Sequence, residues 1–238
     1  MDPAAEIDES FGDAAAWFAA LVQRIPSDGW TAPGLGDWCV RDLVGHTGRA
    51  LSTLTRALGT PAPHVECPSA EAYFVATAAR AAARDAATTD AESDGDSVYA
   101  RGVTAGRALG SDPAAAISDL VRTARVDLAN ARRDGAAAGQ EPSVTTIVGG
   151  MPLREYVRTR TFELVVHGLD LRAAVHRITD EVPLPALPAA SLRDATRTAT
   201  SLAIQRGDGP DLLLALTGRT PMPRDYSVLA PVTDAADA

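Results

Sequence analysis

Glu163, His167 and Asp170 are the residues whose types and spacing point most directly to chemistry in this chain. Their spacing stacks them on one face of an α-helix, because residues three and four apart lie one above the other. The segment from Arg158 to Val175 that contains them is otherwise mostly apolar, with Phe162, Leu164, Val165, Val166, Leu169, Leu171 and Val175. A helix that is apolar on nearly every side is normally buried. A buried carboxylate or imidazole is unfavourable unless a partner satisfies it.

A divalent metal ion is one such partner. A carboxylate and a histidine at i and i+4 can place two ligands on one ion. The alternative is a solvated helix face of alternating charge, which Arg160, Glu163, His167 and Asp170 would also form. The apolar flanks favour the metal, and both interpretations stay open at this point.

His46 is a second candidate, on a helix predicted from Trp38 to Leu58 with Asp37 as its N-cap. The apolar face of this helix carries Leu43, Thr47, Leu51, Leu54 and Leu58. A single histidine at the edge of such a face is more often a hydrogen-bonded core residue than a ligand. His64 and Cys67 lie in a proline-rich loop, and two potential ligands there are too weak a signal to predict a site.

Composition excludes several classes of function. The chain has 238 residues, of which 46% are hydrophobic, and a formal net charge of -9. An acidic chain lacks the basic stripe that nucleic-acid binding requires, and it is equally unsuited to an anionic membrane surface. Two cysteines do not form a disulfide scaffold. Neither a signal peptide nor a membrane-spanning apolar run is recognisable, so a cytoplasmic protein is expected.

Helical periodicity dominates the elements that would position these residues. Besides the two helices already described, helices are predicted over residues 3–25, 70–87, 113–133 and 191–205. The short apolar run Asp211–Leu216 predicts a buried strand. A mobile acidic loop is expected over 88–97, and a frayed tail after Pro231. The prolines after residue 180 mark a linker, so the predicted domains are a helical unit over 1–180 and a small α/β domain over 181–238.

Three motifs together resemble one family. Trp38-Cys-Val-Arg-Asp-Leu-Val-Gly-His46 is similar to the W-x-V-x-D-L-x-x-H segment of the mycothiol-dependent maleylpyruvate isomerase family. Arg160-Thr-Phe-Glu163-Leu-Val-Val-His167-Gly-Leu-Asp170 resembles its R-x-x-E-x-x-x-H-G-x-D segment. The ending Leu-Ala-Leu-Thr-Gly-Arg219-Thr-Pro resembles its C-terminal strand and turn.

The resemblance implies a mainly α fold, in which a DinB-like four-helix bundle is followed by a small C-terminal α/β domain. It implies a divalent metal, with zinc expected, held by His46, Glu163 and His167. It also implies mycothiol as the thiol cosubstrate and Arg219 as an arginine supplied to the site by the C-terminal domain. Two histidines and one carboxylate leave the fourth tetrahedral position open, as in catalytic zinc sites.

The expected function is that of a metal-dependent, mycothiol-using isomerase or S-transferase. Its substrate would be a small electrophile with a carboxylate, such as maleylpyruvate, bound by Arg219 in a bidentate fork. Asp42 and Asp170 are candidates to orient the histidines from outside the ligand set, with plain salt bridges or helix caps as the alternative. A non-catalytic DinB-like metal-binding or regulatory module is the competing function. The partners expected are small molecules, with no nucleic acid and no membrane, for a monomer or a homodimer.

Overall fold

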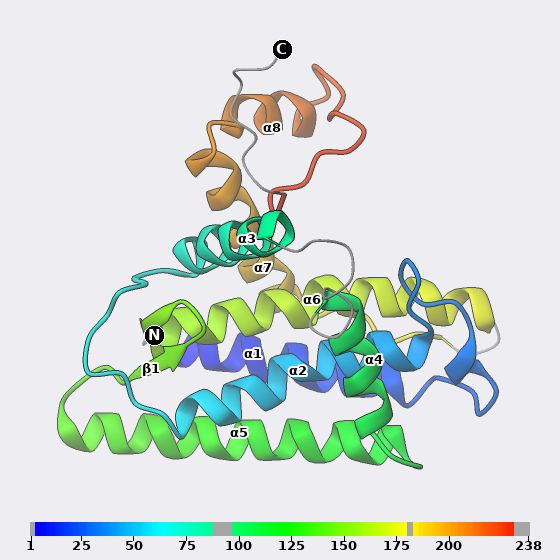
Figure 1. The fold of residues 1–238 in the computed structure, drawn as a ribbon, viewed down its shortest axis with the longest axis horizontal. Helices are drawn as coiled ribbons and strands as arrows, with labels where there is room; N and C mark the ends of the chain where they lie inside the picture. Colours follow the sequence, from blue (N-terminus) through cyan, green and yellow to red (C-terminus); the bar gives the residue numbers. More distant parts are fainter. Residues whose placement is uncertain (1–2, 88–96, 180–182, 231–238) are drawn as a thin grey trace.

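A bundle of long helices forms the body of the computed structural model, which describes residues 3–87, 97–179 and 183–230. Its four helices are α1 (Pro3–Val22), α2 (Val40–Leu58), α5 (Pro113–Ala138) and α6 (Leu153–Ile178). Both α1 and α2 pack against α5 and against α6 (Figure 1). The expected loop over 88–97 lies outside the described residues except for Ser97, and the tail expected after Pro231 lies wholly outside them.

The start of α2 differs from the prediction. Its N-cap is Cys39 rather than Asp37, because the Asp42 carboxylate accepts hydrogen bonds from the Cys39 backbone N–H at 3.2 Å and from its Sγ at 2.9 Å. Together with the approach of the Asp42 backbone N–H to the Cys39 side chain, these bonds form a capping box, which satisfies backbone donors that have no partner within the helix. It fixes the register of α2 from its first turn, and His46 follows one turn after Asp42.

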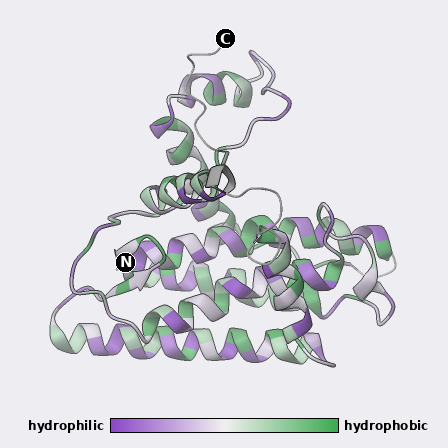
Figure 2. Cartoon of the chain, in the orientation of Figure 1, coloured by the Kyte–Doolittle hydropathy of each residue, from purple (hydrophilic) through white to green (hydrophobic). Residues whose placement is uncertain are grey.

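The central helix is α6, which contacts α1, α2, α3 (Ala70–Ala87) and α7 (Ala189–Gln205). The segment around Glu163 is largely buried, as predicted: Leu164 and Leu171 are completely inaccessible to solvent, whereas Leu169 is 39% exposed. Figure 2 shows hydrophobic residues distributed along the inward faces of the bundle helices. A helix with neighbours on most sides needs the nearly continuous apolar sequence observed here.

A short hairpin leads into α6. Strands β1 (Ser143–Thr146) and β2 (Gly149–Pro152) pair antiparallel, with Val144 opposite Met151. Gly149 has a φ of 106°, a conformation that glycine adopts without strain. This hairpin was not predicted from the sequence.

Helix α4 (Val98–Ala108), which packs across α2, was not predicted from the sequence either. A Cβ at Gly45 would overlap the backbone of Gly106, and one at Gly102 would overlap the Trp38 ring. The helices therefore approach so closely that the contact requires glycines. Glycine is unfavourable within a helix, so two glycines in a short segment weaken the helical signal of the sequence.

The C-terminal region is helical, and the strand predicted over Asp211–Leu216 is wrong. These residues belong to α8 (Gly209–Leu216), which has Pro210 in its first turn and no buried residue. An apolar run without alternation does not separate strand from helix, and the described residues offer no partner strand, because their one sheet pairs β1 with β2 only. The mainly helical class is confirmed, with its small sheet lying before α6. None of the described helices combines the length and apolarity needed to cross a membrane.

Candidate metal centre

His46, Glu163 and His167 meet inside the bundle. One potential ligand atom from each lies within 4.8 Å of the others, and this is the one such cluster found among the described residues. His46 comes from α2, whereas the other two residues lie one turn apart on α6. Bundles commonly build metal sites in this way, from inward side chains on facing helices.

His167 is held between two carboxylates. Its Nε2 lies 3.4 Å from Oε2 of Glu163, and its Nδ1 lies 3.1 Å from Oδ2 of Asp170. Burial alone would lower the pKa of His167, but the hydrogen bonds to Asp170 and Glu163 outweigh it and raise the pKa to about 9. Asp170 thereby fixes the ring so that the opposite nitrogen faces Glu163 and the cluster.

His46 lies in a different environment. Its ring packs against Trp38 at 4.4 Å between centroids and against the edge of His167 at 4.9 Å. Burial, followed by repulsion from His167, lowers its pKa to about 4. His46 Nδ1 is buried and has no hydrogen-bond partner among the described residues. A neutral, incompletely satisfied imidazole is suited to be a metal ligand.

Glu163 is the acid of the cluster. Burial acts to raise the pKa of its carboxyl, but the hydrogen bond from His167 and the charge of Arg160 prevail and lower it. The carboxylate is therefore ionised at neutral pH. Two imidazoles and one carboxylate fit a divalent ion of the zinc type with one coordination position left open.

The other residues predicted for the site lie in different places in the structure. Asp170 contacts His167, as an orienting residue would. Asp42 is a helix cap, bonded to Cys39, which was the alternative considered for it. Arg219 is exposed beyond the end of α8, with its guanidinium 3.4 Å from the Thr217 carbonyl oxygen, and it does not line the pocket beside the cluster. The exposed His64 and the buried Cys67 also lie outside the cluster.

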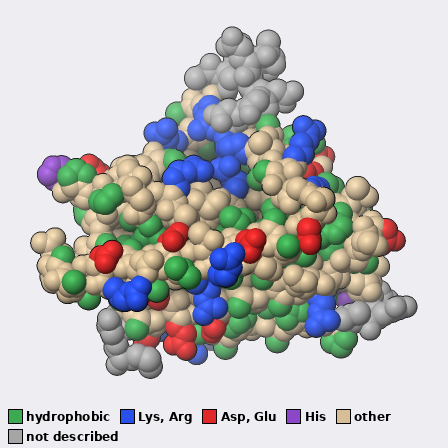
Figure 3. All heavy atoms as spheres, turned by 90° about the horizontal axis from the view of Figure 1, so that it is seen from below, with side chains coloured by type: hydrophobic (Ala, Val, Ile, Leu, Met, Phe, Trp, Pro, Cys, Tyr) green, Lys and Arg blue, Asp and Glu red, His purple; other side chains and the backbone are tan. Residues whose placement is uncertain are grey.

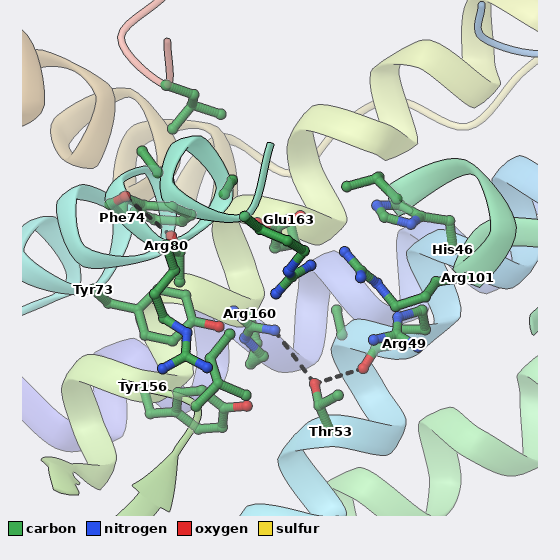
Figure 4. A pocket seen from close by; sticks show the side chains of 18 residues that line it. His46, Arg49, Thr53, Tyr73, Phe74, Arg80, Arg101, Tyr156, Arg160 and Glu163 are labelled. Carbon is green, nitrogen blue, oxygen red and sulfur yellow. Dashed lines mark hydrogen bonds between the residues drawn. The ribbon is translucent and has the colours of Figure 1, made fainter. Parts of the chain in front are cut away.

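A pocket of about 390 Å³ adjoins the cluster and shares His46 and Glu163 with it. Its lining includes five arginines that the sequence analysis did not assign to the site: Arg49, Arg80, Arg84, Arg101 and Arg160. Figure 4 shows labelled arginines from α2, α3, α4 and α6 around this space. The spacing could have indicated two of these arginines. Arg49 follows His46 by three residues and Arg160 precedes Glu163 by three, and residues three apart are neighbours on a helix surface.

The fold and the site together define a class: a mainly helical bundle with a His-Glu-His cluster between two of its helices. Over residues 11–172 the chain matches the family described as the mycothiol maleylpyruvate isomerase N-terminal domain, and it belongs to that family. All three cluster residues fall within the match, and Arg219 falls outside it. Searches of the curated proteins and of the solved structures found no match.

Proposed function

We propose that this protein is a metal-dependent enzyme that uses a low-molecular-weight thiol, mycothiol, in an isomerisation or an S-transfer to a small electrophile. The observation that carries the proposal is the convergence of His46, Glu163 and His167 within 4.8 Å, in a chain of the mycothiol maleylpyruvate isomerase family. The adjoining pocket provides a place for a small substrate at the same cluster.

The residues of the cluster and Asp170 would have separate roles. His46, Glu163 and His167 would hold a divalent ion, with zinc the expected metal. When bound, such an ion lowers the pKa of a coordinated thiol, so that the thiol is present as the nucleophilic thiolate at neutral pH. Asp170 would keep the His167 ring oriented, since the two are hydrogen-bonded at 3.1 Å. Neither cysteine of the chain is then required as a nucleophile.

Elemental analysis tests the metal centre. Wild-type protein should hold about one divalent ion per chain, and His167→Ala should lose it. His176→Ala is the matched control, because His176 lies on the same helix but is exposed and outside the cluster. Equal metal content in wild type and His167→Ala would refute the ligand assignment.

Thiol dependence tests the enzyme. Metal-loaded protein should convert an electrophile such as maleylpyruvate only when mycothiol is present. Turnover without a thiol would contradict the proposal, and failure of the metal-loaded protein to bind mycothiol would favour a non-catalytic metal-binding module.

The proposed role of Arg219 as a carboxylate anchor is tested in the same assay. Arg219→Ala is expected to lower kcat/KM with metal content unchanged, because a charge-assisted bidentate contact would be lost. If Arg219→Ala were as active as wild type, Arg219 would not bind the substrate, and the arginines of the pocket would be the candidates for that role.

A further inference from the structure

The two histidines of the cluster are held in different ways. The His167 ring is fixed by polar contacts, since its Nδ1 lies 3.1 Å from Asp170 and its Nε2 lies 3.4 Å from Glu163. Nδ1 of His46, by contrast, is buried and has no hydrogen-bond partner among the described residues. A histidine that binds a metal is usually oriented by a hydrogen bond from its second ring nitrogen to a carboxylate or a carbonyl. The orientation of His46 therefore needs another explanation.

Aromatic contacts surround the His46 ring on two sides. The Trp38 ring lies 4.4 Å from it between centroids, with an angle of 36° between the two planes. The His167 ring meets it edge-on, at 4.9 Å and 87°. A planar ring that is packed between two other rings has little room to turn, because protein interiors are close-packed.

The pocket beside the cluster leaves the remaining side of His46 less restricted. His46 lines this space of about 390 Å³ together with Glu163. Figure 3 shows a hollow bordered by basic side chains on one face of the molecule. Open space sets no steric limit on a ring. The restraint on His46 must therefore come from its packed neighbours, and Trp38 is the nearer of the two rings that contact it.

Trp38 is itself held by α4 and by its own loop. Its side chain is 8% exposed, and its indole N–H donates to the Tyr99 carbonyl oxygen at 3.0 Å. A Cβ on Gly102 would lie 2.4 Å from Cε2 of the indole, so the ring rests directly on the backbone of α4. The backbone of Trp38 bonds to Leu35 at 3.0 Å and to Gly34 at 2.8 Å. The indole therefore cannot shift without moving α4.

We propose that Trp38 is a positioning residue, which holds the His46 imidazole in the orientation that completes the cluster with Glu163 and His167. Helix α4 thereby takes part in the site without supplying a ligand, because its backbone fixes the indole. One histidine is then oriented by a carboxylate and the other by an aromatic ring. As a statement about metal affinity this inference rests on the proposed function, whereas as a statement about the ring in the metal-free protein it does not.

Titration with Co²⁺ tests this role, because the visible absorption of the bound ion depends on the arrangement of its ligands. Trp38→Leu removes the ring and should weaken Co²⁺ binding about tenfold or more, with a changed absorption spectrum. Trp38→Phe places an aromatic ring against His46 again and should recover most of the affinity and the wild-type spectrum. A purely structural role for Trp38 would not restore the spectrum in this way.

Gly102→Ala displaces the indole instead of removing it, because the added methyl group overlaps the ring. It should weaken Co²⁺ binding in the same direction as Trp38→Leu, although Gly102 lies outside the cluster. This variant gives the result should Trp38→Leu fail to fold. Wild-type affinity and spectrum in Gly102→Ala would contradict the positioning role.

Trp17→Leu is the matched control. Trp17 is also buried, its indole N–H also donates to a carbonyl oxygen at 3.0 Å, that of Pro185, and its ring also rests on a helical glycine, Gly168. The aromatic contacts of His46 and His167 do not include Trp17. Trp17→Leu should therefore leave Co²⁺ affinity unchanged. An equal loss of affinity in Trp17→Leu and Trp38→Leu, or no loss in Trp38→Leu, would overturn the inference.

Nuclear magnetic resonance of chelator-treated protein separates this inference from the proposed function. Nuclear Overhauser contacts between the rings of His46 and His167 should be present in wild type and in Trp17→Leu, and lost in Trp38→Leu. If wild type bound no Co²⁺ but showed this pattern, the proposed function would fail and the positioning role would stand. If Trp38→Leu kept both the ring contacts and the Co²⁺ affinity, only the positioning role would fail.

Discussion

The two histidines of the candidate metal centre differ in protonation although their ring centroids are 4.9 Å apart. In the metal-free protein at pH 7, His46 is neutral because its pKa is about 4, and His167 carries a proton because its pKa is about 9. Only a neutral imidazole can coordinate a metal ion. Glu163, whose pKa is lowered, contributes its carboxylate without losing a proton.

Metal binding should therefore release about one proton per ion at pH 7, the proton of His167. The release should decline as the pH rises through about 9, because His167 has then already lost its proton. Below a pH of about 4, His46 also becomes protonated and metal affinity should fall further. Calorimetry in two buffers of different ionisation enthalpy measures the number of protons. A value near zero at pH 7 would mean that His167 is neutral before the ion binds.

Two aspartates near the histidines provide a paired test of residue roles. Asp170→Asn should weaken metal binding roughly 10–100-fold, because the hydrogen bond that orients His167 loses its charge. Asp42→Asn should leave metal affinity unchanged and lower the free energy of unfolding by about 1 kcal/mol through the cap of α2. Competition with a chelating dye and urea denaturation separate the two effects. An equal loss of affinity in both variants would contradict these assignments.

The sequence was informative about which residues cluster and less so about the residues around them. Glu163 and His167 were identified because both the i, i+4 spacing and the apolar flanks are local features of one helix. Arg49 and Arg101 were missed because they come together only through packing of α2 against α4. The role of Asp42 could not be decided from the sequence either, because its spacing from His46 fits an orienting residue and a helix cap equally well.

At the scale of elements, the contact between α2 and α4 is made by backbone as much as by side chains. Gly45 lies directly before His46 and faces Gly106, so the position of α4 and its Arg101 relative to the metal centre depends on a residue without a side chain. Short helices with two glycines are hard to recognise from periodicity, and this is why α4 was not predicted. The prediction for the α8 segment was wrong for the opposite reason. Its strong apolar run favoured a strand, but the described residues contain no strand with which it could pair.

Gly45→Ala should destabilise the protein by about 1–3 kcal/mol, the range for overpacking a tight contact. Gly12→Ala is the control, because a Cβ there would meet only the Arg125 side chain at ordinary contact distance, and alanine favours a helix. Thermal unfolding of the two variants beside wild type measures the difference. Should Gly45→Ala unfold at the wild-type temperature, the close approach of α2 and α4 would be disproved.

At the scale of the whole molecule, one arginine joins three helices. Arg158 on α6 contacts Glu71 on α3 and Asp194 on α7, and its Nη2 donates to Thr198 Oγ1 at 3.2 Å. Further contacts tie the C-terminal segment to the bundle, since the Trp17 indole donates to the Pro185 carbonyl oxygen and Ser191 Oγ to that of Ser10. These hydrogen bonds and ion pairs cross the predicted boundary at residue 180.

Arg158→Ala should lower the free energy of unfolding by on the order of 3 kcal/mol, because it leaves the partly buried carboxylates of Glu71 and Asp194 without the cation that pairs with them. Metal content should be retained, since Arg158 lies outside the cluster. Arg172→Ala provides the comparison, as Arg172 is an exposed arginine of the same helix. Urea unfolding gives the free energies, and hydrogen exchange should show faster opening of α7 than of α1. Unchanged exchange in α7 would argue against the joining role.

The contact between the Trp38 and His46 rings gives the candidate metal centre an optical reporter of its own. The indole ring lies 4.4 Å from the imidazole, and its N–H is fixed to the Tyr99 carbonyl oxygen at 3.0 Å. A change of charge on His46, whether from a proton or from an ion, therefore occurs in direct contact with a chromophore whose emission depends on nearby charge. Occupancy of the site should be readable as a change in intrinsic fluorescence without any label, and Trp38→Phe should abolish that change while the metal remains bound.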